Sequence, residues 1–142
     1  MNKFISNQLQ TQIITVPIYD RDVVVCCDKH ELPKFGIDTT HWIEPDSTCE
    51  GRTLNNMDTG TTVILFRDKH PKAGVIAHEC LHTMNFILER CGVTPARMND
   101  EADAYLLQFL IEAVNVAVEN INKYEHTVEF FYLTAVMTRY KI

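Results

Sequence analysis

Residues 71–92 read PKAGVIAHECLHTMNFILERCG, and they carry the strongest pattern in this chain of 142 residues. At about 100° per residue, the spacing of an α-helix, the apolar side chains collect on one broad arc while His78 and His82 fall opposite. Pro71 suits the first turn of a helix, and Gly92 suits its left-handed end. We therefore expect an amphipathic helix whose buried face carries Ile76, Ala77, Cys80, Leu81, Met84, Ile87, Leu88 and Cys91.

The string His78-Glu79-Cys80-Leu81-His82 within this helix fits the pattern H-E-x-x-H. Side chains four positions apart lie one turn above each other, so two imidazoles can bind one metal ion. Glu79 lies beside them, where it can reach a water on that metal without being a ligand. The pattern predicts a zinc hydrolase with His78 and His82 as ligands and Glu79 as general base. The alternative interpretation is a solvated polar face that happens to hold two histidines.

A second helix is expected over residues 99–120, which read NDEADAYLLQFLIEAVNVAVEN. Asn99 is a suitable N-cap, and acidic residues in the first turn favour the positive end of the helix dipole. Most of the circumference is apolar, so this helix should be largely buried with one thin polar stripe. The stripe begins at Glu101 and continues through Tyr105, Gln108, Glu112, Asn115 and Glu119.

A catalytic zinc site needs a third protein ligand and one open position for water. Glu101 stands 19 positions after His82, far enough for a helix to end and turn back beside the two imidazoles. Asp100 and Asp103 are rival carboxylates, although Asp103 projects about 200° around the helix from Glu101. An ordinary carboxylate at a helix start is the alternative interpretation of Glu101.

Residues 60–112, with the strings IAHECLHTMNFILERCGV and NDEADAYLLQFL, resemble the gluzincin class of metallopeptidases. More narrowly, they are similar to small zincin-like proteins encoded by bacteriophages and prophages. The third ligand of gluzincins is a glutamate on the helix after H-E-x-x-H, often in an N-E-A context, and Glu101 matches it within N-D-E-A. The resemblance implies one zinc ion held by His78, His82 and Glu101, with Glu79 as general base and a peptide or protein as substrate.

Tyr105 marks a departure from the larger gluzincins, in which an aspartate one turn after the ligand glutamate supports the first histidine. A phenol can accept a hydrogen bond from an imidazole N–H, but it is a weaker anchor than a carboxylate. Tyr105 is therefore a candidate catalytic residue, either lining the cleft or placing its hydroxyl on the oxyanion. A tyrosine at the edge of the core is the alternative.

Strand patterns and turn signals alternate before the motif helix, over residues 13–18, 23–27, 52–57 and 61–66. We expect an α+β fold: a small zincin-like domain whose N-terminal, mainly antiparallel sheet packs on the H-E-x-x-H helix and the following glutamate-bearing helix. The resemblance to zincins implies that the strand just ahead of the motif helix, residues 61–66, forms the upper rim of the cleft. An extended peptide can pair with such a free edge; an interior strand is the alternative. Residues 32–42 fit a short helix or a loop, and residues 124–142 favour a third helix over a late strand.

The composition is that of one folded domain over residues 1–142, with 46% hydrophobic residues. A formal net charge of −6 and scattered Lys and Arg disfavour a nucleic-acid partner. No apolar run reaches membrane-spanning length and no secretory signal is seen, so we expect no membrane partner. The odd number of cysteines without C-x-x-C indicates free thiols in a reducing compartment, the cytoplasm (of a bacterial host, if phage-encoded). The sequence leaves the oligomeric state open.

Four functions are compatible with these patterns, and one of them, a regulator that clips or binds a repressor, cannot be separated by sequence from the first of the other three. The first is a zinc-dependent metallopeptidase that hydrolyses peptide bonds through a metal-activated water, with Glu79 as general base. The second is a non-catalytic zincin-fold protein for binding, phage assembly or regulation. The third is an interaction module with a coincidental motif. The intact Glu79 favours the first, because a scaffold does not need a carboxylate at that position.

Overall fold

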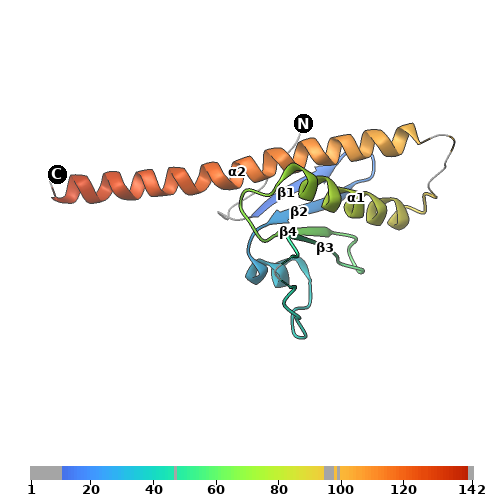
Figure 1. Cartoon of the computed structure of the whole chain (residues 1–142), viewed down its shortest axis with the longest axis horizontal. Helices are drawn as coiled ribbons and strands as arrows, with labels where there is room; N and C mark the ends of the chain where they lie inside the picture. Colours follow the sequence, from blue (N-terminus) through green and yellow to red (C-terminus); the bar gives the residue numbers. More distant parts are fainter. Residues whose placement is uncertain (1–10, 47, 95–97, 99, 141–142) are drawn as a thin grey trace.

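The structure, a computed structural model, describes residues 11–46, 48–94, 98 and 100–140, with side chains described as far as Lys123. These residues form one four-stranded sheet and three helices, a small α+β fold (Figure 1). The strands lie in the order β1-β2-β4-β3. In chain order the elements are β1 (Thr11–Val16), β2 (Arg21–Cys26), η1 (Lys29–Phe35), β3 (Gly51–Asn55), β4 (Thr62–Phe66), α1 (Ala73–Arg90) and α2 (Glu101–Tyr140).

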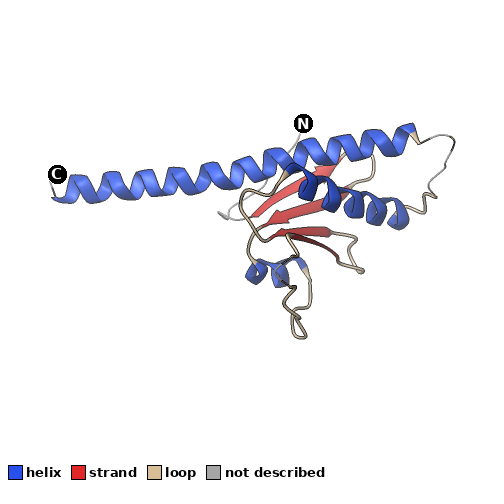
Figure 2. Cartoon of the chain, in the orientation of Figure 1, coloured by secondary structure: helices blue, strands red, loops and turns tan. Residues whose placement is uncertain are grey.

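The sheet is mixed. β1 pairs with β2 and β3 pairs with β4 in the expected antiparallel sense, whereas β2 and β4 are parallel. Figure 2 shows both α-helices on one face of the sheet. On that face α2 packs against β1 and β2, and α1 packs against β4 and β3. The first α-helix therefore lies over the β3 side of the sheet.

β4 lies inside the sheet, between β2 and β3, so the prediction that residues 61–66 form a free rim is wrong. Its side chains alternate between two layers: Ile64 and Phe66 pack with the α-helices, and Val63 and Leu65 face the η1 side. A strand covered on both faces carries a continuous apolar run, which is the reason for the string TVILF. The edge strand next to α1 is β3 instead.

α1 confirms the expected helix, and Gly92 follows it with a φ of 69°, the left-handed end that the sequence predicted. The buried face, however, is rotated from the expected arc. Leu81 is 46% exposed, whereas Glu79 and Thr83 are buried. The cause is that α1 packs against β3 as well as β4, so the side of the helix that carries Glu79 is buried too.

The first hairpin turns earlier than expected. β1 ends at Val16, because Pro17 has no N–H for the ladder and Ile18 takes a φ of 69°. The turn therefore occupies residues 17–20 instead of 19–22. After β2, η1 is a short helix whose N-cap, Asp28, accepts a hydrogen bond from the backbone N–H of His30.

α2 is a single helix of 40 residues, so residues 124–140 are helical as favoured but continue the second helix instead of forming a third. Figure 1 shows its C-terminal half extending beyond the sheet. The predicted N-cap, Asn99, lies outside the described residues. By length and composition Glu101–Lys123 could cross a membrane. Here its apolar side packs on the sheet and on α1, as the core helix of a folded domain does.

Candidate active site

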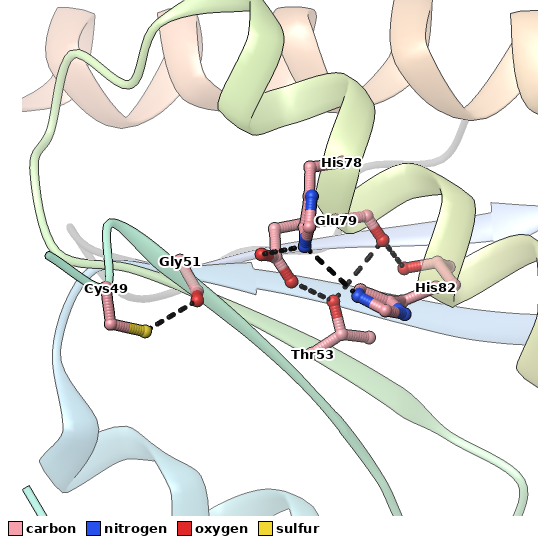
Figure 3. A network of polar contacts seen from close by, with 7 residues as sticks. Cys49, Gly51, Thr53, His78, Glu79 and His82 are labelled. Atoms are coloured by element: carbon pink, nitrogen blue, oxygen red, sulfur yellow. Dashed lines mark hydrogen bonds and ion pairs between the residues drawn. The ribbon is translucent and has the colours of Figure 1, made fainter. Parts of the chain in front are cut away.

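The two imidazoles of α1 converge on one point. His78 and His82 both lie exposed on the helix, with their Nε2 atoms 3.2 Å apart and their rings at 74° to each other (Figure 3). Two nitrogens at tetrahedral corners of one zinc ion, each about 2.0–2.1 Å from it, would lie about 3.3–3.4 Å apart. Without a cation, the same spacing suits a hydrogen bond from one ring N–H to the other ring's lone pair. The spacing of the two nitrogens is thus compatible with a shared cation and with a direct hydrogen bond.

Glu79 is buried between α1 and β3, although it belongs to the polar motif. Its side chain is 5% exposed, and its Oε2 accepts a hydrogen bond of 2.5 Å from the hydroxyl of Thr53. The other oxygen, Oε1, lies 4.0 Å from Nε2 of His78. One oxygen is thus anchored to the sheet, and the other faces the histidine pair, as Figure 3 shows.

Gly51 allows β3 to approach this carboxylate. A Cβ at position 51 would lie 2.9 Å from Cγ of Glu79 and 3.1 Å from its Oε1, closer than a side chain tolerates. Gly51 and Thr53 occupy alternate positions of β3, so both face α1. Sequence reasoning missed these two residues, because 26 positions separate Thr53 from Glu79 and only the fold brings them together.

A hollow of about 280 Å³ opens beside the carboxylate, between residues 48–51 and the first half of α1. His78 and Glu79 form part of its wall, with Gly51 on the opposite side. The hollow therefore borders His78 and Glu79 of the motif.

β3 leaves one backbone edge open beside this hollow. The backbone N–H of Arg67 donates to the carbonyl of Glu50, at the start of the pairing between β3 and β4. Hydrogen-bonded positions alternate along an antiparallel pair, so the even-numbered residues of β3 are the ones bonded to β4. Odd-numbered residues of β3 therefore direct their N–H and C=O groups away from β4, where no strand of the described chain pairs with them. The outward groups belong to Gly51, Thr53 and Asn55. One of them has a partner already, because the carbonyl of Gly51 accepts a hydrogen bond of 3.1 Å from the thiol of Cys49 (Figure 3).

Cys80, next to Glu79, is fully buried in the core cluster. Burial, with a smaller effect of the Glu79 charge, raises the pKa of its thiol to about 12. A metal ligand must be the thiolate, so this cysteine packs as a small apolar residue, as its position on the helix indicated.

The described residues do not form the predicted three-ligand site. Glu101 is exposed in the first turn of α2, and no group of three or more His, Cys, Asp or Glu side chains in the described part of the chain could hold a metal ion. Two features of the fold keep Glu101 away from the histidine pair. α1 continues for eight residues beyond His82, about 12 Å, before the chain reverses. In addition, α2 lies over β1 and β2, whereas Glu79 meets β3.

Tyr105 also lies on α2, and it is 68% exposed. Within the described residues no hydrogen bond or ring contact links it to His78, Glu79 or His82. The structure thus brings together three of the five predicted site residues: His78, His82 and Glu79, the predicted general base.

Comparisons with known proteins return no match: no family model, no curated protein and no solved structure is similar to this chain. The resemblance to gluzincins and to zincin-like phage proteins is therefore wrong as a family assignment. The finding that overturns it is the lack of a metal-ligand group of three among the described residues. What the chain shares with those proteins is the H-E-x-x-H pattern on one helix and the carboxylates at the start of the next.

Proposed function

We propose that the chain is a metal-dependent hydrolase of peptide bonds, with His78 and His82 binding a divalent cation, zinc, and Glu79 acting as general base. The observation that carries this proposal is the convergence of the two imidazole Nε2 atoms, 3.2 Å apart, beside a buried carboxylate anchored by Thr53. Catalytic zinc usually has three protein ligands. The described residues supply two of them, so zinc binding should be weaker than at a complete site.

When bound, the cation would polarise a substrate carbonyl and lower the pKa of water. The chain's own part in the reaction belongs to Glu79. Oε1 accepts a proton from the attacking water and returns it to the leaving amine, while the Thr53 hydroxyl holds Oε2 in place. Because the side chain is held on one oxygen, the other keeps its direction through the proton transfer.

The open edge of β3 supports an extended peptide as the substrate. Its outward N–H and C=O groups, from Gly51 to Asn55, can form a ladder with another strand, in which a peptide N–H would replace the Cys49 thiol at the carbonyl of Gly51. Such a strand would pass the hollow beside Glu79, which Gly51 lines as well. Edge pairing holds the backbone whatever the side chains are, so it positions a peptide bond more strictly than it selects a sequence.

A peptide-binding protein without turnover is the second candidate. It is favoured by the missing third ligand among the described residues. It would use the same β3 edge but would need neither the cation nor Glu79. Turnover therefore distinguishes the two candidates.

The test is hydrolysis of a peptide library, with added zinc, by the full chain and by its Glu79→Gln variant, with mass spectrometry as readout. We expect cleavage by the wild type and a loss in kcat/KM of about 100- to 10,000-fold in the variant, as for a positioned general base. Glu89→Gln is the matched control, because Glu89 is exposed on the same helix. Cleavage at the wild-type rate by Glu79→Gln would contradict the base assignment. Peptide binding without any cleavage would favour the second candidate.

A further inference from the structure

A second hollow, of about 240 Å³, lies largely on the other face of the sheet, and we call it the Trp42 hollow. Its lining includes Trp42, Arg52 and Leu65, which belong to the η1 side. Cys49 and Gly51 line it as well, and the same two residues line the hollow beside Glu79. The two hollows therefore meet at the start of β3.

Arg52 is one of the charged residues that line the Trp42 hollow, together with Asp28, Lys29, Glu44 and Arg67. Since Gly51 and Thr53 face α1, Arg52 projects to the opposite face, where its guanidinium carbon lies 4.7 Å from the centre of the Trp42 ring. Nη1 donates to the carbonyl of Ile43 at 3.3 Å. Among the described residues no carboxylate forms an ion pair with Arg52.

Lys29 forms an ion pair with Glu44, and the carboxylate of Asp28 accepts the backbone N–H of His30. Arg67, the other guanidinium of the lining, is exposed and donates to the backbone carbonyls of Pro45 and Asp46. Arg52 differs from it because its guanidinium is half-buried and lies on the ring of Trp42. Arginine presents a planar fork of donors that can bind a carboxylate through two parallel hydrogen bonds while its face stays stacked on an aromatic ring.

We propose that the Trp42 hollow receives an acidic side chain of the bound peptide, Asp or Glu, and that Arg52 selects it. This inference rests on the proposed function in one respect, namely that an extended peptide pairs with β3. The residue directly opposite Arg52 in such a pairing projects to the same face of the sheet as Arg52. Because the outward hydrogen bonds come from the odd-numbered residues, position 52 is a non-hydrogen-bonded position of an antiparallel pair, where facing side chains lie closest.

Trp42 makes the binding measurable, because it is the single tryptophan of the chain. The experiment uses the full chain with Glu79→Gln, so that bound peptides are not consumed. The probes are three Val- and Thr-rich octapeptides that differ only at one central residue, which is Glu, Gln or Lys. Trp42 fluorescence gives the dissociation constant of each peptide. We expect the Glu peptide to bind about tenfold tighter than the Gln peptide, as for a charge-assisted hydrogen bond, and the Lys peptide to bind weakest.

Arg52→Gln should abolish the preference for Glu over Gln, and Arg52→Lys should retain part of it, because charge remains without the planar fork. Arg90→Gln is the matched control: Arg90 also donates to backbone carbonyls, those of Met57 and Asp58, but it does not line the Trp42 hollow. Equal binding of all three peptides, or a preference that survives Arg52→Gln, would overturn the proposal. So would the absence of any fluorescence change.

Failure of this inference and failure of the proposed function give different results. If the chain prefers the Glu peptide but cleaves no peptide, the proposal for the Trp42 hollow stands and the proposed hydrolase function is wrong. If it cleaves peptides in a Glu79-dependent way without preferring Glu, the hydrolase function stands and the proposal for the Trp42 hollow is wrong.

Discussion

The two sides of α1 have different neighbours and different chemistry. Towards α2 the helix shares an apolar core with side chains such as Leu106 and Leu110. Towards β3 the helix carries a buried carboxylate, which the hydroxyl of Thr53 on the edge strand contacts. An exposed pair of imidazoles lies beside that carboxylate. The covered side holds the fold together, and the side at the open sheet edge carries the reactive groups.

The largest expected effect is on stability, and it separates the two sides directly. Leu110 is fully buried, so Leu110→Ala should lower the free energy of unfolding by about 2–5 kcal/mol, the usual cost of a cavity. His82→Ala removes an exposed side chain and should change it by no more than about 0.5 kcal/mol. Urea denaturation in the presence of a chelator measures both values. Equal losses would show that the division between the two sides is incorrect.

Gly51→Ala should damage the β3 side more than an added methyl group usually does. The new Cβ would lie 2.9 Å from Cγ of Glu79, so the carboxylate must move, at a cost of about 1–3 kcal/mol in stability. We also expect a loss of peptide hydrolysis. Gly74→Ala is the control for stability, because nothing lies within 4 Å of its added Cβ and alanine favours the helix. If both variants are equally stable in thermal denaturation, the close approach of β3 to Glu79 is wrong.

Thr53→Val tests whether the sheet positions the base. The variant keeps the shape of the side chain but removes the hydrogen bond to Oε2 of Glu79, which should cost about 1 kcal/mol of stability. We expect kcat to fall more than KM changes, since the loss concerns the direction of a catalytic group. Thr53→Ser restores a hydroxyl and should recover most of kcat. A full loss in Thr53→Ser as well would point to packing instead of the hydrogen bond.

The sequence predicted much of the fold and part of the site. The apolar period of residues 73–90 and the glycine that follows them gave α1, and the β-branched runs gave four strands close to their observed bounds. Hydrophobic pattern alone could not say which strand is the edge, because β4 and β3 were both marked by turn signals. Strand order depends on contacts between distant residues, and the parallel pairing of β2 with β4 has no local signature.

The site shows the same limit. His78, Glu79 and His82 are close in sequence, and one helix is enough to bring them together. Thr53 and Gly51 come from another element, so no spacing marks them. Glu101 was assigned from its distance along the chain, but the position of α2 over β1 and β2 places it on the other side.

The smallest expected effect concerns Glu101. Because it does not join the histidine pair, Glu101→Gln should leave zinc affinity unchanged, within about twofold, in isothermal titration. A large loss of affinity would mean that α2 approaches the β3 side of α1 when the cation binds. That result would break the comparison between the two sides.

The account depends most on whether the histidine pair binds a cation. The direct measurement is native mass spectrometry of the full chain with zinc in slight excess, for the wild type, His82→Ala and the exposed control Asn85→Ala. We predict one zinc ion per chain in the wild type and in Asn85→Ala, and none in His82→Ala. The absence of zinc from the wild type, or the same zinc content in all three proteins, would contradict the account.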